Sequence, residues 1–211
     1  APIDRRSLIA GAAGLAVAST LARPATAATG GLAALAPATG LTARTTAFLA
    51  TLDDKARRAA SFPWGGPQWR TWNYFGVGGY VKPGLRLEQM SAPQREAAWA
   101  MLAEVLSPAG LEKARTVMEL QDILAEQGNG RGKRSALRFS WSVFGTPAAA
   151  GQWGLRVEGH HLSLSFAVAD GNIVSVTPSA FAALPNRVTS GRKAGLVTLR
   201  SEEHTSELQS R

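Results

Sequence analysis

Glu158, His160 and His161 lie within the stretch "RVEGHHLSLSF" at residues 156–166 and are the chain's clearest candidates for chemistry. A catalytic zinc-type site needs about three ligands from His, Asp or Glu, with one position left open for water. On an unbroken strand, Glu158 and His160 project from the same face, because side chains alternate with a period of two. His161 would join them only if Gly159 formed a bulge.

Two other interpretations of these residues stay open. The histidines could transfer protons without a metal. They could also be hydrogen-bonded structural residues of a sheet, with Glu158 paired to Arg156 or Arg138. The hypothesis that uses all three side chains is a site for one divalent transition metal, with Glu158, His160 and His161 as its ligands.

An aromatic-rich stretch, "FPWGGPQWRTWNYFGVGGY" at residues 62–80, supplies a second candidate site. Rings in a loop of this kind can form a platform that binds a sugar or another ring. They can equally cover a core beneath an irregular backbone. The candidate ligand-binding residues are Trp64, Trp69, Trp72 and Tyr74.

Composition excludes several other chemistries. The chain has no cysteine, which rules out disulfides, thiolate zinc sites and cysteine nucleophiles. No G-x-S-x-G nucleophile motif occurs, and "GNGRGKR" at residues 128–134 lacks the spacing of a phosphate-binding loop. The formal net charge is +8, but the basic residues are scattered, which favours a solvated surface over a nucleic-acid interface.

The elements that must position these residues begin with helices. Apolar residues at three- and four-residue spacing predict a helix that Thr42 caps, that extends to Ala59 and that ends before Pro63. Ser91 and Gln94 form a capping box that opens a second helix, and Ser107 caps a third helix that Gly128 ends. The second and third helices are expected to form a helical hairpin.

From Leu137 the pattern changes to alternation, which predicts strands at residues 137–144, 152–157, 160–168 and 172–177, with a further strand at 195–199. Asp170-Gly171 predicts a two-residue hairpin in which Val168 faces Ile173, Phe166 faces Ser175 and Leu164 faces Thr177. In this register His160 and His161 point to opposite sides of the sheet. The expected fold class is α+β, with N-terminal helices and a helical hairpin packed on a mainly antiparallel sheet of four or more strands.

The N-terminal segment has the layout of an export signal at residues 1–27. Arg5 and Arg6 precede an uncharged run, and Ala25 and Ala27 form a small-x-small cleavage pattern. The arginine pair is typical of a twin-arginine signal, and a general secretory signal is the alternative. We therefore expect the export machinery as a partner, no stable membrane span, and a periplasmic or extracellular location.

The remaining boundaries follow from composition. Residues 28–40 are a linker rich in alanine, threonine and glycine, and residues 41–199 form a single α+β domain. The final stretch, "RSEEHTSELQSR" at 200–211, matches the in-frame translation of a common sequencing adapter. We interpret residues 200–211 as an artefact of that kind, and the domain as truncated at its C-terminus.

A resemblance is carried by "FLATLDD", "KPGLRLEQMSAPQREAAW" and "GLEKARTVMELQDIL", together with "QWGLRVEGHHLSLSFAV" and "DGNIVSVTP". These motifs resemble the bacterial family called domain of unknown function 3500, from about Thr42 to Leu199. Glu158-Gly159-His160-His161-Leu162 is the most specific part. The resemblance implies an exported α+β protein and supplies no activity, substrate or catalytic residue.

Two functional hypotheses follow, and whether the protein is an enzyme stays open between them. The first is a metal-assisted hydrolase of the cell envelope that uses Glu158, His160 and His161. The alternative is a non-catalytic extracytoplasmic binding protein that contacts a small-molecule or envelope ligand through the aromatic-rich segment at residues 62–80. We expect no nucleic-acid partner in either case.

Overall fold

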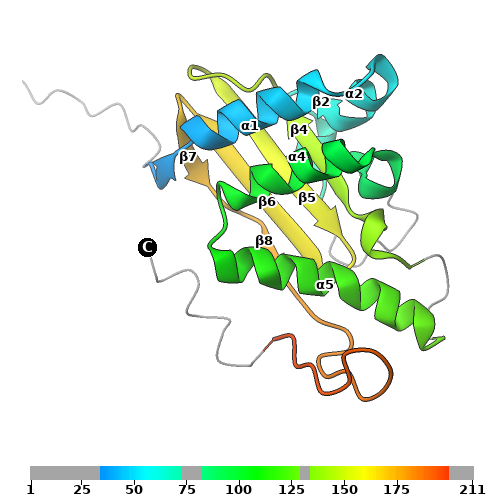
Figure 1. Ribbon diagram of the computed structural model, residues 1–211. Coiled ribbons are helices and arrows are strands. Elements are labelled where there is room, and N and C mark those ends of the chain that lie inside the picture. Colours follow the sequence, from blue (N-terminus) through cyan, green and yellow to red (C-terminus); the bar gives the residue numbers. More distant parts are fainter. Residues whose placement is uncertain (1–33, 73–81, 129–133, 200–211) are drawn as a thin grey trace, which may run out of the picture. The chain divides into compact units, whose positions relative to one another are not determined.

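The computed structural model describes residues 34–72, 82–128 and 134–199 (Figure 1). Several predictions fall outside these ranges: the export signal with Arg5, Arg6, Ala25 and Ala27, residues 28–33 of the linker, Tyr74, and the adapter-like segment 200–211. Within the described part of the chain, no helix is long and apolar enough to cross a membrane.

Two helices, not one, occupy the first predicted helical region. Helix α1 spans Thr39–Ala50 and α2 spans Asp54–Ala60. The single helix predicted from Thr42 to Ala59 is therefore wrong. Asp53 explains the break, because its side chain accepts a hydrogen bond from Ala56 N at 2.7 Å and so caps a new helix.

The predicted helical hairpin is present as α4, Ala92–Ala103, and α5, Pro108–Glu126. Ser91 and Gln94 form the expected capping box, with the Gln94 side chain accepting from Ser91 N at 2.8 Å. Ser107 caps α5 by accepting from Gly110 N at 3.1 Å. The shorter helical elements are α3 Pro67–Arg70, η1 Leu87–Gln89 and η2 Ala136–Arg138.

The strands form one mainly antiparallel sheet, which confirms the α+β fold class. Its main path has the order β1-β7-β6-β5-β4-β2, with β3 beside β4 and β8 beside β6, and only the β2–β4 pair is parallel among the described strands. The long strands are β4 Ser140–Phe144, β5 Gln152–Gly159, β6 Leu162–Ala169 and β7 Asn172–Ser175, and the short ones are β1 Ala36–Pro37, β2 Ser61–Phe62, β3 Leu85–Arg86 and β8 Ser179–Phe181.

The register between β6 and β7 was only partly predicted. Val168 pairs with Ile173 as expected, but Ser175 pairs with Ala167 instead of Phe166, because the register shifts between Ala167 and Val168. Leu164 in turn pairs with Ser179 of β8. The strand expected at 195–199 is reduced to an isolated bridge from Val197 to Arg187.

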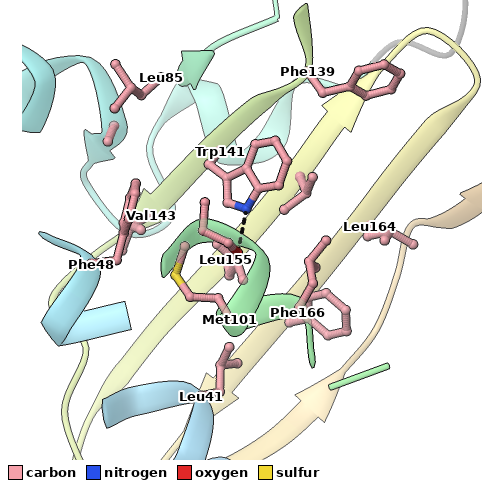
Figure 2. Close-up of a cluster of buried hydrophobic side chains, with 14 of the residues drawn as sticks. Leu41, Phe48, Leu85, Met101, Phe139, Trp141, Val143, Leu155, Leu164 and Phe166 are labelled. Carbon is pink, nitrogen blue, oxygen red and sulfur yellow. Dashed lines mark hydrogen bonds between the residues drawn. The ribbon is translucent and has the colours of Figure 1, made fainter. Parts of the chain in front are cut away.

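Helices α1, α4 and α5 cover one face of the sheet (Figure 1). Trp141 lies at the centre of the core between them, where its Nε1 donates to Ala98 O of α4 at 3.2 Å (Figure 2). The strand residues that point into this core are apolar and buried, and they include Trp141, Val143, Trp153, Leu155, Val157, Leu164, Phe166 and Val168.

The second face of the same strands is polar and is also buried. Its six polar residues are Ser140, Ser142, Arg156, Glu158, Ser163 and Ser165. Strand pairing brings them into rows, since Ser140 and Ser163 flank Glu158 while Ser142 and Ser165 flank Arg156. Buried polar groups need hydrogen-bond partners, so whatever packs on this face must supply them.

Candidate functional site

His160 and His161 form the turn between β5 and β6, because β5 ends at Gly159 and β6 begins at Leu162. The prediction that they begin a strand and point to opposite faces is therefore wrong. His161 has φ +69°, a left-handed conformation that turns require. The two imidazole centroids lie only 3.8 Å apart.

Gly159 forms no bulge and pairs in register with Leu162. A different constraint explains the glycine. A Cβ built at Gly159 would lie 2.2 Å from the Phe139 ring. The glycine therefore lets an aromatic side chain of the core pass directly beneath the turn.

His160 contacts α5 and the start of the segment that leads to β4. Its Nδ1 lies 2.8 Å from Gln121 Oε1 and 2.9 Å from Arg134 Nη1. Burial, followed by the nearby His161, Arg134 and Lys82, lowers the pKa of His160 to about 4. Burial and Arg134 also lower the pKa of His161. Both imidazoles are consequently neutral at pH 7, the form that accepts a proton or binds a metal.

Glu158 lies on the polar second face of the sheet and is completely buried. Its Oε2 accepts from Lys82 Nζ at 3.1 Å, so the predicted pairing with Arg156 or Arg138 is wrong. Its Oε1 makes no hydrogen bond within the part of the chain that the structure describes. A buried carboxylate oxygen without a hydrogen bond lowers the stability of the folded state. This feature distinguishes Glu158 from the other polar residues of the face.

The three predicted metal ligands differ in their surroundings. Glu158 pairs with Lys82 over the second face, whereas His160 bonds to Gln121 of α5. Residues 34–72, 82–128 and 134–199 hold no group of three His, Asp or Glu side chains arranged to bind a metal ion. Metal binding by Glu158, His160 and His161 stays a prediction.

Arg156 ties the aromatic-rich segment to the sheet. Its Nε donates to Ser165 Oγ at 2.9 Å, and its Nη2 donates to Trp69 O at 2.7 Å. Nη1 donates to Gln68 O at 3.0 Å and to Thr71 O at 3.2 Å. One buried guanidinium thus satisfies three backbone carbonyls of the segment that crosses the second face.

Trp64 and Trp69 pack on the sheet. Their ring centroids lie 4.6 Å apart, and Trp69 meets the Phe144 ring edge-on at 5.0 Å. Both rings cover Gly154, where a Cβ would come within 2.9 Å of each. Trp64 Nε1 also donates to Gln152 Oε1 at 3.0 Å. Nothing but hydrogen fits at Gly154 beneath the two rings.

Trp72 differs from these two rings. Its side chain is 39 % exposed, and its Nε1 donates to Ser163 Oγ at 2.7 Å. Ser163 is the cross-strand partner of Glu158, so the indole is anchored next to the Lys82–Glu158 pair. Of the four candidate ligand-binding rings, Trp72 therefore combines exposure with a fixed orientation, and Tyr74 lies outside the described residues.

Sequence reasoning did not identify Lys82, Gln121 or Arg134 as members of the site. One available signal was the alternation itself: "SWSV", "RVE" and "SLS" each place polar residues on the face opposite the apolar one. Such a face needs partners if it is buried. The partners come from distant segments, and no local pattern names them.

Comparison with known families identifies a family that the chain matches. Residues 35–208 match the model of a family described as protein of unknown function (DUF3500), and this range includes residues 200–208 of the adapter-like segment. Neither a curated protein nor a solved structure matches the chain. Because the match covers most of its length, the chain belongs to the DUF3500 family.

Proposed function

We propose that this is an exported binding protein whose ligand stacks on the Trp72 indole beside the Lys82–Glu158 ion pair. The ligand class that fits is a sugar or another polar molecule with one apolar ring face, as found in the cell envelope. The observation that carries the proposal is the exposed indole fixed by its hydrogen bond to Ser163.

Exposure and fixed orientation act together in this proposal. An exposed indole offers a large apolar face, and its orientation is already set before any ligand arrives. Charged groups at the edge of such a ring can hydrogen-bond the polar rim of a ligand. Lys82, with 17 % of its side chain exposed, is placed to do so beside the buried Glu158.

Isothermal titration calorimetry with a panel of soluble envelope oligosaccharides tests this proposal. We expect saturable binding that Trp72→Ala weakens by about tenfold or more, the loss typical of a central aromatic contact. Leu184→Ala is the matched control, because Leu184 is also an exposed apolar side chain. Equal binding by wild type and Trp72→Ala would reject the proposal.

Export is proposed from the sequence of residues 1–27. Fusing these residues to a reporter that is active only outside the cytoplasm tests it. We expect export of the fusion and its loss when Arg5 and Arg6 are both replaced by lysine, because twin-arginine transport reads the arginine pair. Export that survives the replacement points to the general secretory route, and a reporter retained inside the cell contradicts the proposal.

A hydrolase of the cell envelope is a second candidate, favoured by the Glu158 Oε1 that lacks a hydrogen bond among the described residues. In this candidate Glu158 takes a proton from an attacking water molecule. Glu158→Gln keeps the side-chain shape but cannot accept that proton. We expect purified protein to release soluble products from isolated envelope material, and Glu158→Gln to lose about a hundredfold or more. Equal release by both proteins, or none by wild type, would remove this candidate.

A further inference from the structure

The His160 contacts form a small polar cluster on the helix side of the β5–β6 turn. Arg134 Nη1 lies 3.2 Å from Gln121 Oε1 and 2.9 Å from His160 Nδ1, and Gln121 Oε1 lies 2.8 Å from the same Nδ1. Gln121 is 98 % buried, at 2 % exposure, although its neighbours on α5 are largely apolar core residues.

These three contacts cannot all be hydrogen bonds at once. An arginine nitrogen only donates, while a histidine nitrogen either donates or accepts. If Nδ1 lacks a proton, it faces the Gln121 oxygen as a second acceptor. If Nδ1 carries the proton, it faces Arg134 as a second donor. Turning the Gln121 amide over places its NH₂ group against the guanidinium. Every arrangement leaves one unfavourable contact.

The cluster also has an excess of donors and of positive charge. Within the described ranges, Gln121 Nε2 and Arg134 Nε have no hydrogen-bond partner, and Arg134 makes no ion pair. The acids of the region have other partners, since Glu158 bonds Lys82 and Asp122 accepts from Ala136 N at 2.9 Å. Besides burial and His161, the groups that lower the His160 pKa are the cations Arg134 and Lys82.

An oxyanion would remove both problems. Gln121 Nε2 and Arg134 Nε, the donors that lack a partner among the described residues, could both donate to one bound oxygen group. The negative charge of that group would offset the charge of Arg134. Charge-assisted bonds of this kind to a guanidinium are among the stronger hydrogen bonds in proteins. We propose that Arg134, Gln121 and His160 form a binding site for an oxyanion, which is a carboxylate or phosphate group carried by a ligand.

The site is separate from the proposed contact at Trp72, and its test does not depend on that contact. The full chain is titrated at pH 7 with sodium acetate and with sodium phosphate, against sodium chloride of equal ionic strength. Calorimetry and the shift in Tm measure binding. We expect saturable binding of at least one anion, and the two titrations distinguish a carboxylate from a phosphate ligand.

Two variants of the site and two control variants make the result specific. Arg134→Gln should weaken binding by about tenfold or more, and Gln121→Met should weaken it several-fold at nearly constant side-chain volume. Arg138→Gln, a half-buried arginine in η2, should leave binding unchanged. Trp72→Ala should also leave it unchanged, so failure here and failure of the oligosaccharide proposal can be told apart.

Clear outcomes overturn the inference. These are absence of binding by both anions, a Tm that rises without saturation, or equal binding by Arg134→Gln and wild type. If Arg134→Gln does not fold, Arg134→Lys identifies the Arg134 Nε–H signal in the NMR spectrum of the wild type. That signal must then shift with either anion and saturate, and an unshifted signal rejects the site.

Discussion

Two faces of the same three strands, β4 to β6, are buried in different ways. The face toward α1, α4 and α5 is lined by Trp141, Leu155 and other apolar side chains. The opposite face carries serines together with Arg156 and Glu158, and it is buried to the same degree. Burial therefore does not distinguish the faces. The faces differ in the contacts that they need. Apolar contacts are non-directional, whereas buried polar groups need specific hydrogen-bond donors and acceptors.

The two faces consequently respond differently to change. A core of alkyl and aromatic groups loses energy in proportion to the contacts and volume removed. A polar face loses energy when a single partner is removed and the other group stays buried. The second face also fixes the path of the segment above it, since Arg156 binds carbonyl groups of Gln68, Trp69 and Thr71.

The largest effect should come from the apolar face. Trp141 is fully buried, meets the Trp99 ring edge-on at 5.8 Å and bonds Ala98 O. We expect Trp141→Ala to lower the free energy of unfolding by roughly 3 to 5 kcal/mol, because it leaves a large cavity. Urea denaturation measures the change. Trp141→Phe should lose clearly less, and equal losses would mean that volume does not govern this face.

Arg156→Met tests the polar face at similar side-chain length. We expect a loss of roughly 2 to 4 kcal/mol, because the segment above loses its buried hydrogen-bond donor. The distinguishing measurement is hydrogen exchange. Amides of residues 68–72 should exchange faster in Arg156→Met than in a core variant of equal stability. Uniform acceleration in both would show that Arg156 does not hold this segment in particular.

Lys82 and Glu158 test whether the polar face is governed by pairing. Lys82→Met leaves a fully buried carboxylate without this hydrogen-bond donor, which should cost roughly 1 to 3 kcal/mol. The double variant with Glu158→Gln should recover part of this loss, because the buried charge is gone. Chemical denaturation of the four proteins in this cycle gives the coupling energy. Additive losses would show that the ion pair contributes nothing beyond its separate side chains.

Local signals predicted most of the fold. Ser91 and Ser107 marked the starts of α4 and α5, and the period-two patterns located β4 to β7. These features depend on residues a few positions apart, where capping and alternation act. The same alternation accounts for the position of Arg156 and Glu158 on one face of β5.

The candidate site depended on contacts that local patterns do not contain. The pairs Lys82–Glu158 and Gln121–His160 join residues far apart in the sequence. His160 and His161 were mistaken for strand residues, because a turn of two histidines lacks the Gly, Asn or Asp that usually marks one. The same limit explains the register shift near Val168, which no residue type in that hairpin signals.

The histidine turn, at the end of the hairpin, should make the smallest contribution and the one most sensitive to pH. Burial, followed by His161 and the cations Arg134 and Lys82, lowers the pKa of His160 from 6.5 to about 4. Between these values the unfolded chain binds a proton that the folded chain does not. The contribution of His160 to the free energy of unfolding is therefore fully present above pH 6.5. It decreases as the pH falls from 6.5 to 4, and it decreases no further below pH 4.

His160→Asn removes this titration and keeps a polar group near the Nδ1 position. Because the ring is only about half buried, we expect wild type to lose roughly 1 to 2 kcal/mol more than the variant between pH 7 and pH 4.5. Urea denaturation at several pH values measures the difference, with His161→Asn as the neighbouring control, since Asn tolerates the left-handed backbone there. Parallel profiles for wild type and His160→Asn would mean that His160 is protonated as easily in the folded chain as in the unfolded one. Solvent would then screen the charges of the cations around the turn. The electrostatic environment of His160 would in that case differ from that of Glu158 on the polar face by more than the burial of the two residues indicates.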